Sequence, residues 1–180
     1  MKFIKTKLKG NFLITPEFQI DERGFFARNF CKKEFLTKNL NTKWVQINNS
    51  MSYKSKTIRG LHYQRPPYQE IKLIRCIKGS IYDVVVDLRK NSKTYQKWFG
   101  AILSEKNRTM MYVPKGFAHG YLSLTADTEI FYLSSEFYQP QYEEVLLWND
   151  PDLKIIWPKK PNFLSKKDSD GKLLKNLVSM

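Results

Sequence analysis

The sequence contains few of the residues that build covalent cross-links or metal sites. Only two cysteines, Cys31 and Cys76, occur among its 180 residues, and they form no disulfide framework. Only two histidines are present, and they form no His-x-His pair. Zinc and iron sites need several converging imidazole, thiolate or carboxylate ligands, so we expect no resident metal.

Long apolar runs are also missing. Met1 is followed by Lys2-Phe3-Ile4-Lys5, so the sequence predicts no secretory leader, and no stretch approaches the length of a membrane span. We therefore expect a cytoplasmic protein that does not partner with a membrane.

Acidic residues are scarce relative to basic ones. Lysine and arginine total 31 against 17 aspartates and glutamates, which gives a formal net charge of +14. Such an excess can serve a polyanionic partner. However, the lysines are scattered, and no zinc-finger, helix-turn-helix or glycine-arginine pattern is present. We interpret the charge as a solubilising surface, or as a basic pocket for a nucleotide diphosphate, and expect no nucleic-acid partner.

Short strand-like segments recur along the chain between turn residues. The stretch Ile81–Asp87 is β-branched and continuous, which predicts a buried strand, and Lys78-Gly79 before it predicts a hairpin turn. Helices are expected only over Lys32–Leu40 and Lys172–Val178. A chain of this length favours one domain over residues 1–180, and many short strands favour a sandwich or jelly-roll barrel. The expected strands are Asn11–Thr15, Trp44–Ser50, Ile71–Ile77, Ser80–Leu88, Trp98–Leu103, Thr109–Val113, His119–Leu124 and Thr128–Leu133.

Both histidines lie within two residues of a glycine, at the edge of a strand, where a barrel mouth binds ligands. Proton abstraction beside a carbonyl needs a base, a cation for the enolate oxygen and a second acid on the opposite face. His62 is the candidate base, since an ordinary imidazole has a pKa of about 6.5. Lys72 and Tyr132 are candidates for the cation and the acid, although a tyrosine in an aromatic strand is more often part of the core.

Taken together, the motifs resemble those of the dTDP-4-dehydrorhamnose 3,5-epimerases. The resemblance covers nearly the whole chain and implies an all-β, cupin-like jelly-roll barrel with a few short helices. It also implies a homodimer, with no metal and no organic cofactor. The residues that carry it are Asp21–Phe26, Arg59–Gln64, Lys72–Cys76, Asp83–Arg89, Pro114–Gly120, Trp148–Pro151 with Trp157-Pro158, and Leu164–Asp168.

The resemblance also assigns roles around a nucleotide-diphosphate sugar with a 4-keto-6-deoxy ring. It implies that His62 is the base, oriented by Asp168, that Lys72 stabilises the enolate oxygen and that Tyr132 returns the proton. Tyr138 falls where the family stacks an aromatic ring on the nucleobase. The full set of implied substrate contacts is Arg23, Arg28, Gln46, Asn48, Arg59, His119, Tyr138, Glu143 and Lys167.

Two motifs are expected to shape the fold instead of the chemistry. These are Asp83–Arg89, in which Arg89 is expected to be a structural ion-pair partner, and Trp148–Pro151.

Arg28 departs from the family pattern, which has glutamate at this position. A cation in place of an acceptor predicts either another nucleotide, such as GDP or CDP, or dTDP with Arg28 facing solvent or phosphate. The segment Asn49–Thr57 is one residue longer than the family pattern. It leads toward the strand of His62, so its length can change the shape of the pocket and thereby which carbon is inverted. The alternatives left open are a C3-only or C5-only epimerase, a sugar 3,4-ketoisomerase on a similar barrel, and a non-catalytic sugar-nucleotide-binding protein.

Overall fold

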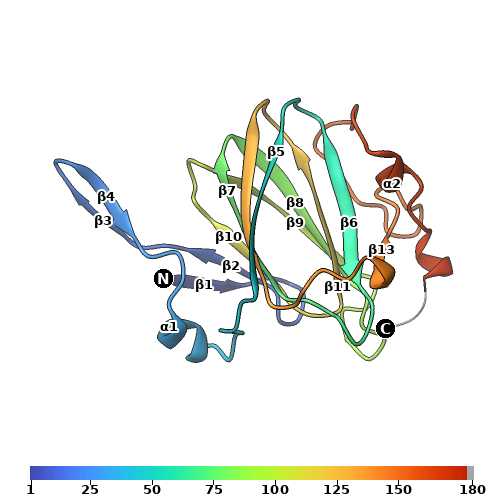
Figure 1. Cartoon of the computed structure of the whole chain (residues 1–180), viewed down its shortest axis with the longest axis horizontal. Coiled ribbons are helices and arrows are strands. Elements are labelled where there is room, and N and C mark those ends of the chain that lie inside the picture. Colours follow the sequence, from blue (N-terminus) through green and yellow to red (C-terminus); the bar gives the residue numbers. More distant parts are fainter. Residues whose placement is uncertain (178–180) are drawn as a thin grey trace.

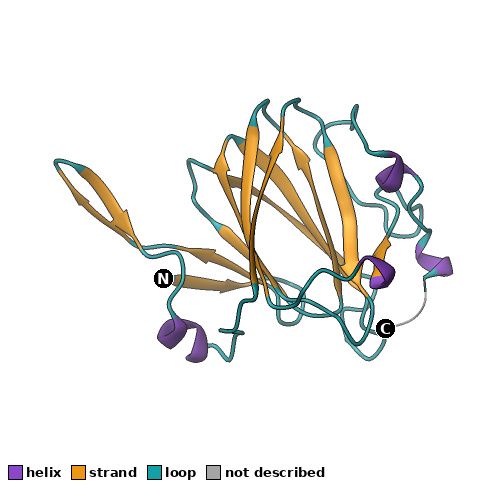
Figure 2. Ribbon diagram, in the orientation of Figure 1, coloured by secondary structure: helices purple, strands orange, loops and turns teal. Residues whose placement is uncertain are grey.

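Two antiparallel sheets face one another in the computed structural model, which describes residues 1–177 (Figure 1). Strands dominate, and the helices are few and short (Figure 2), which confirms the expected all-β fold class. In order across the first sheet lie β1 (Lys2–Lys5), β2 (Phe12–Thr15), β10 (Met110–Val113), β7 (Lys72–Lys78), β12 (Thr128–Ser134) and β5 (Gln46–Ser52). The second sheet contains β13 (Glu143–Val145), β6 (Ile58–Gln64), β11 (Phe117–Ser123), β8 (Ser80–Asp87) and β9 (Trp98–Ser104).

A separate two-stranded hairpin, β3 (Phe18–Asp21) and β4 (Gly24–Ala27), projects away from the sandwich (Figure 1). Gly24 closes its turn with a φ of +128°, a conformation that glycine adopts readily because it has no Cβ atom. The sequence analysis singled out this segment as a motif but did not predict its strands. Strands β1, β6 and β13 were also not predicted.

The main core fills the space between the two sheets. Because side chains alternate along a strand, Ile74 and Cys76 on β7 point to the same side and meet Val85 of β8. The opposite face of β8 is buried as well, since Val84 and Val86 pack against Leu174 of the C-terminal segment. Burial on both faces explains the continuous apolar run of Ile81–Asp87 and confirms the predicted buried strand.

The C-terminal segment folds back over the second sheet. Isolated parallel bridges tie Phe163 to Thr57 and Lys172 to Leu146. The buried carboxylate of Asp150 accepts the backbone N–H of Leu174 at 2.7 Å. This docking places α2 (Lys166–Ser169) beside β6.

Both helix predictions need correction. Helix α1 (Lys32–Leu36) ends four residues early, because Asn39 takes a left-handed φ of +54° that a right-handed helix does not contain. The helix predicted over Lys172–Val178 is wrong, since only the 3₁₀ turn η2 (Leu174–Asn176) forms there and Val178 lies outside the described residues. A second 3₁₀ turn, η1 (Pro140–Tyr142), precedes β13. Every helix within residues 1–177 is too short and too polar to span a bilayer.

Asp87 organises the connection from β8 to β9. Its carboxylate is fully buried and accepts hydrogen bonds from Arg89, Ser92 and Thr94 at 2.6–2.8 Å. Burial raises the pKa of Asp87, but these donors outweigh burial and hold the pKa below its ordinary value. The ion pair confirms the structural role predicted for Arg89.

Replacing this carboxylate tests its contribution to stability. Since the pKa of Asp87 is depressed in the folded state, its stabilisation is present at neutral pH and is lost as the pH falls through the folded-state pKa. We expect Asp87→Asn to lower the free energy of unfolding by about 3 kcal/mol at pH 7 in urea titrations. The deficit should shrink near pH 3. The exposed Asp127, whose φ of +49° also suits asparagine, provides the control Asp127→Asn. An equal deficit at both pH values would contradict the assignment.

Candidate active site

Two adjoining chambers open between the sheets, near the end of β6 and the beginning of β7. The inner chamber has a volume of about 220 Å³ and the outer about 340 Å³, and His62, Lys72 and Tyr132 line both. The inner chamber is completed by Ser50, Arg59, Ile74, His119, Tyr121 and Ile130. The outer one is completed by Gln46, Asn48, Tyr63, Gln64, Glu70, Ser134, Tyr138 and Glu143.

Polar side chains of the first sheet line the chambers because alternate residues of a strand share a face. Tyr132 of β12 lies in register between Asn48 of β5 and Ile74 of β7. Two residues further along β12, Ser134 lies in register between Gln46 of β5 and Lys72 of β7. Since residues two apart share a face, these side chains all point between the sheets. The sequence predictions included four residues of this lining, Gln46, Asn48, Lys72 and Tyr132.

His62 and Asp168 form the shortest functional contact of the inner chamber. His62 Nε2 lies 2.6 Å from Asp168 Oδ1, and Asp168 is held at α2 by a hydrogen bond from its backbone N–H to Ser165 Oγ. Burial raises the pKa of Asp168, but the hydrogen bond and charge of His62, together with hydrogen bonds from Ser165 and the Gly60 backbone, outweigh burial and keep the pKa below its ordinary value. An ionised Asp168 requires the proton on Nε2, which leaves the Nδ1 lone pair of His62 free to accept a proton.

A second histidine–carboxylate pair lies opposite the first. His119 of β11 is the register partner of His62 on β6, and its Nε2 lies 2.7 Å from the fully buried Asp83. Each histidine is thus held by its own carboxylate. Within residues 1–177, no three His, Cys, Asp or Glu side chains gather as the ligands of a metal would.

Tyr132 and Lys72, the other two residues predicted to be reactive, line both chambers. Burial raises the pKa of Tyr132, with the positive charge of Lys72 acting in the opposite direction, so the phenol is protonated at neutral pH. Lys72 Nζ lies 2.9 Å from Glu70 Oε1, and both side chains are largely buried. His62 and Tyr132 come from opposite sheets, so a ring between them would meet a base on one side and an acid on the other.

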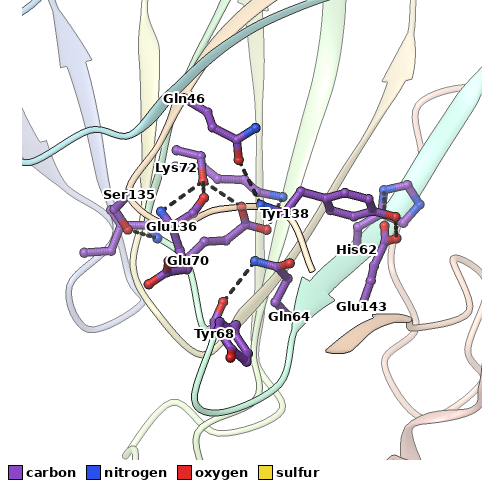
Figure 3. A network of polar contacts seen from close by, with 12 residues as sticks. Gln46, His62, Gln64, Tyr68, Glu70, Lys72, Ser135, Glu136, Tyr138 and Glu143 are labelled. Atoms are coloured by element: carbon purple, nitrogen blue, oxygen red, sulfur yellow. Dashed lines mark hydrogen bonds and ion pairs between the residues drawn. The ribbon is translucent and has the colours of Figure 1, made fainter. Parts of the chain in front are cut away.

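The outer chamber carries a polar rim (Figure 3). Glu143 accepts a hydrogen bond from Tyr138 Oη at 2.5 Å and forms an ion pair with Lys167. Burial raises the pKa of Glu143, but Lys167 and Tyr138 outweigh it and the carboxyl is ionised; the same hydrogen bond raises the pKa of Tyr138. Gln46 Oε1 accepts the backbone N–H of Tyr138 at 2.9 Å and fixes its loop.

Arg23 and Arg28 do not line these chambers. Arg23 lies on the projecting hairpin and pairs with Asp21 at 2.6 Å, and Arg28 lies 3.5 Å from Glu34 of α1. Both side chains are exposed. The fold therefore brings Asp168 and Lys167 of the C-terminal segment to the chamber residues on the strands. The two arginines stay outside the chambers of a single chain.

Sequence reasoning also missed several lining residues. The alternation along β5 and β12 could have extended the predicted lining from Asn48 to Ser50 and from Tyr132 to Ser134. Glu70 lies before β7 begins, so no strand period marks it.

Comparison with known proteins gives a consistent picture. A family model described as dTDP-4-dehydrorhamnose 3,5-epimerase matches residues 5–176. The enzyme of that name from Methanothermobacter thermautotrophicus is 44% identical over 177 residues, covering 97% of this chain and 95% of its own length. The Bacillus anthracis crystal structure of that name, with TDP and PPi bound, has a TM-score of 0.93 at 42% identity and covers 96% of this chain and 98% of its own. A 3'-monoepimerase from Streptomyces bikiniensis in complex with dTDP-quinovose has a TM-score of 0.89 at 30% identity, covering 96% and 87%.

The coupling between His62 and Asp168 can be measured directly. In His62→Ala, burial of Asp168 persists while its main hydrogen-bond donor is lost, so we expect its pKa to rise above the ordinary aspartate value of about 3.9. Carbon NMR of labelled aspartate carboxyls would follow the titration. His119→Ala serves as the control, since His119 pairs with Asp83 instead. An Asp168 pKa that stays depressed without His62 would rule out this coupling.

Proposed function

The chain belongs to the dTDP-4-dehydrorhamnose 3,5-epimerase family, and on that premise we propose that it converts dTDP-4-keto-6-deoxyglucose to dTDP-4-keto-rhamnose in deoxysugar synthesis. It is an isomerase that inverts C3 and C5 of the sugar. The observation that carries the proposal is the His62–Asp168 pair, in which His62 Nδ1 lies 3.9 Å from Glu143 Oε1, in a chamber shared with Lys72 and the protonated Tyr132.

Each inversion begins with removal of a proton beside the ketone. The C4 carbonyl acidifies the protons at C3 and C5, and His62 Nδ1 takes one of them while Asp168 stabilises the imidazolium. The electron pair moves onto the C4 oxygen as an enolate, which the ammonium of Lys72 stabilises. The enolate collapses when Tyr132 gives its phenolic proton to the opposite face of the same carbon. Proton exchange with solvent returns His62 and Tyr132 to their starting states.

The outer chamber is proposed to hold the nucleotide end. Tyr138 offers an exposed ring for stacking on the base, and Lys167 offers a cation for the diphosphate. Gln46 and Asn48 provide amide donors and acceptors on the same wall. Arg59 and His119 line the inner chamber and are proposed to hold the sugar or its diphosphate.

The nucleotide is proposed to be dTDP and not GDP or CDP, because similar structures contain TDP and dTDP-quinovose. Inversion at a single centre is the alternative activity, because the similar 3'-monoepimerase shares the fold.

We also propose a homodimer. The projecting hairpin exposes 80% of Ile20 and 61% of Phe26, and 63% of Ile47 is exposed on the outer face of β5. A hairpin that buries so little apolar surface is not stable alone, and a second copy would cover it. Such docking would carry Arg23 and Arg28 toward the partner's site, which accounts for their distance from the chambers of their own chain.

A cytoplasmic location is part of the proposal. Both cysteines are unpaired, as is usual in a reducing compartment.

Proton exchange tests the catalytic roles. Proton NMR in D₂O with dTDP-4-keto-6-deoxyglucose should show loss of both the C3 and C5 signals. His62→Ala should slow both exchanges by about 10²–10⁴-fold, because no other base replaces it. Tyr132→Phe should permit exchange while impairing inversion at one or both centres. Full exchange in His62→Ala would show that the base is another residue.

The same experiment separates the alternatives. Loss of one signal would indicate a single-centre epimerase. Loss of neither would direct the assay to GDP- and CDP-linked 4-keto sugars.

Sedimentation velocity tests the dimer. Ile20→Asp puts a charge on the hairpin surface that the second copy would bury, so we expect a shift toward monomer and weaker binding of dTDP. Ile156→Asp is a matched control, since Ile156 is 75% exposed on the C-terminal segment. An Ile20→Asp protein that remains dimeric would argue against docking through the hairpin.

A further inference from the structure

Glu70 stands out as a buried acid at the site to which the mechanism assigns no step. We infer that Glu70 is a positioning residue, which holds the ammonium of Lys72 in place for the enolate and is itself held by Ser134. The inference rests on the proposed function, because it concerns how the enolate is stabilised.

The two oxygens of the Glu70 carboxylate have separate partners. Oε1 lies 2.9 Å from Lys72 Nζ, and Oε2 accepts a hydrogen bond from Ser134 Oγ at 2.8 Å. The side chains of Glu70 and Lys72 are only 15% and 13% exposed, and Ser134 is 2% exposed. With both oxygens engaged, the carboxylate plane is fixed, and so is the direction from which it meets Lys72 (Figure 3).

The strand register builds this arrangement. Ser134 of β12 is the direct partner of Lys72 on β7, so the two side chains emerge next to each other between the sheets. Glu70 precedes Lys72 by two residues and is tied to β12 as well, since the backbone N–H of Ile71 donates to Ser135 Oγ at 2.8 Å. The segment that carries Glu70 is therefore pinned to the strand that carries Ser134 and Tyr132.

Lys72 needs such support because of its chemistry. Lysine is a point charge on a flexible four-carbon stem, so it has no fixed geometry of its own. The inner chamber also contains Arg59, and His62 becomes a cation when it takes the substrate proton. An unpaired ammonium there would be repelled from the position that the enolate needs.

Glu70 does not remove Lys72 from the reaction. An ammonium has three N–H donors, of which Glu70 occupies one and leaves two for the C4 oxygen. A donor held in place before the reaction stabilises the enolate without rearrangement during it. The positioning effect should therefore outweigh the partial neutralisation of charge.

The test compares chemistry with binding. Glu70→Gln keeps the shape but removes the charge, and we expect exchange of the C3 and C5 protons in D₂O to slow by about 10–100-fold, less than the 10²–10³ typical of deleting such a donor. The affinity for dTDP, which lacks the ketone, should not fall. Glu70 and Lys72 also line the outer chamber proposed for the nucleotide, and the loss of a negative charge there favours an anionic diphosphate, whereas the rate of exchange depends on the placement of Lys72.

Two further variants complete the design: Ser134→Ala, and a control variant at an ion pair outside the chambers. Ser134→Ala should slow exchange less than Glu70→Gln, and the double variant should be no slower than Glu70→Gln alone, because Ser134 acts through Glu70. Glu129→Gln breaks a longer and more exposed ion pair, Glu129 of β12 with Lys78 of β7 at 4.0 Å, outside both chambers, and should exchange at the wild-type rate.

Three results would overturn the inference. These are an unchanged or faster exchange in Glu70→Gln, additive losses in the double variant, and a loss of dTDP affinity as large as the loss of rate. Failure of the proposed function is separate, since wild-type protein would then show no exchange at either carbon.

Discussion

The hydrogen bond between His62 and Asp168 joins residues 106 positions apart, and the C-terminal segment must cross the second sheet to make it. The segment is held there by Leu174, which packs on Val84 and Val86, and by the backbone bond from Leu174 to Asp150. The apolar outer face of β8 is thus a requirement of the chemistry as well as of stability. Together with the backbone bridges at Phe163 and Lys172, this apolar packing places Asp168.

The inward-facing side chains of the sandwich change from apolar to polar along its strands. On β12 the inward side chains run from Ile130 in the core, through Tyr132, to Ser134 at the outer chamber. On β7 they run from Cys76, through Ile74, to Lys72. The apolar end packs tightly and holds the register, and the polar end is positioned by that packing. Reactive groups on strands are more rigidly placed than groups on loops, which suits a reaction that must distinguish two faces of one carbon.

The charged groups of the site compensate one another in pairs. His62 has Asp168, His119 has Asp83, and Lys72 has Glu70. Asp168 and Asp83 each lie within hydrogen-bond distance of a histidine Nε2, and Glu70 pairs with the ammonium of Lys72, since buried charges are tolerated only when paired or hydrogen-bonded. The excess positive charge of the sequence is therefore not concentrated in the candidate active site, where carboxylates offset the cations.

Most strands of the two sheets and the burial of β8 could be predicted from the sequence, because strand period is a local property. Residue chemistry likewise made His62, Lys72 and Tyr132 candidates for the reaction, although β6, which carries His62, was not among the predicted strands. The sequence did not determine the helix ends. Residues 172–177 follow the tertiary contacts of Leu174 instead of helix propensity, and the hairpin strands had no core face to mark them. The pairing of Asp168 with His62 was implied by the family resemblance and by no local pattern. Packing between distant segments also placed Glu70 and Ser134 beside Lys72 and separated Arg23 and Arg28 from the chambers of their own chain. The physical reason is that a side chain's face is set within its strand, whereas its partner is set by packing between strands that lie far apart in the sequence.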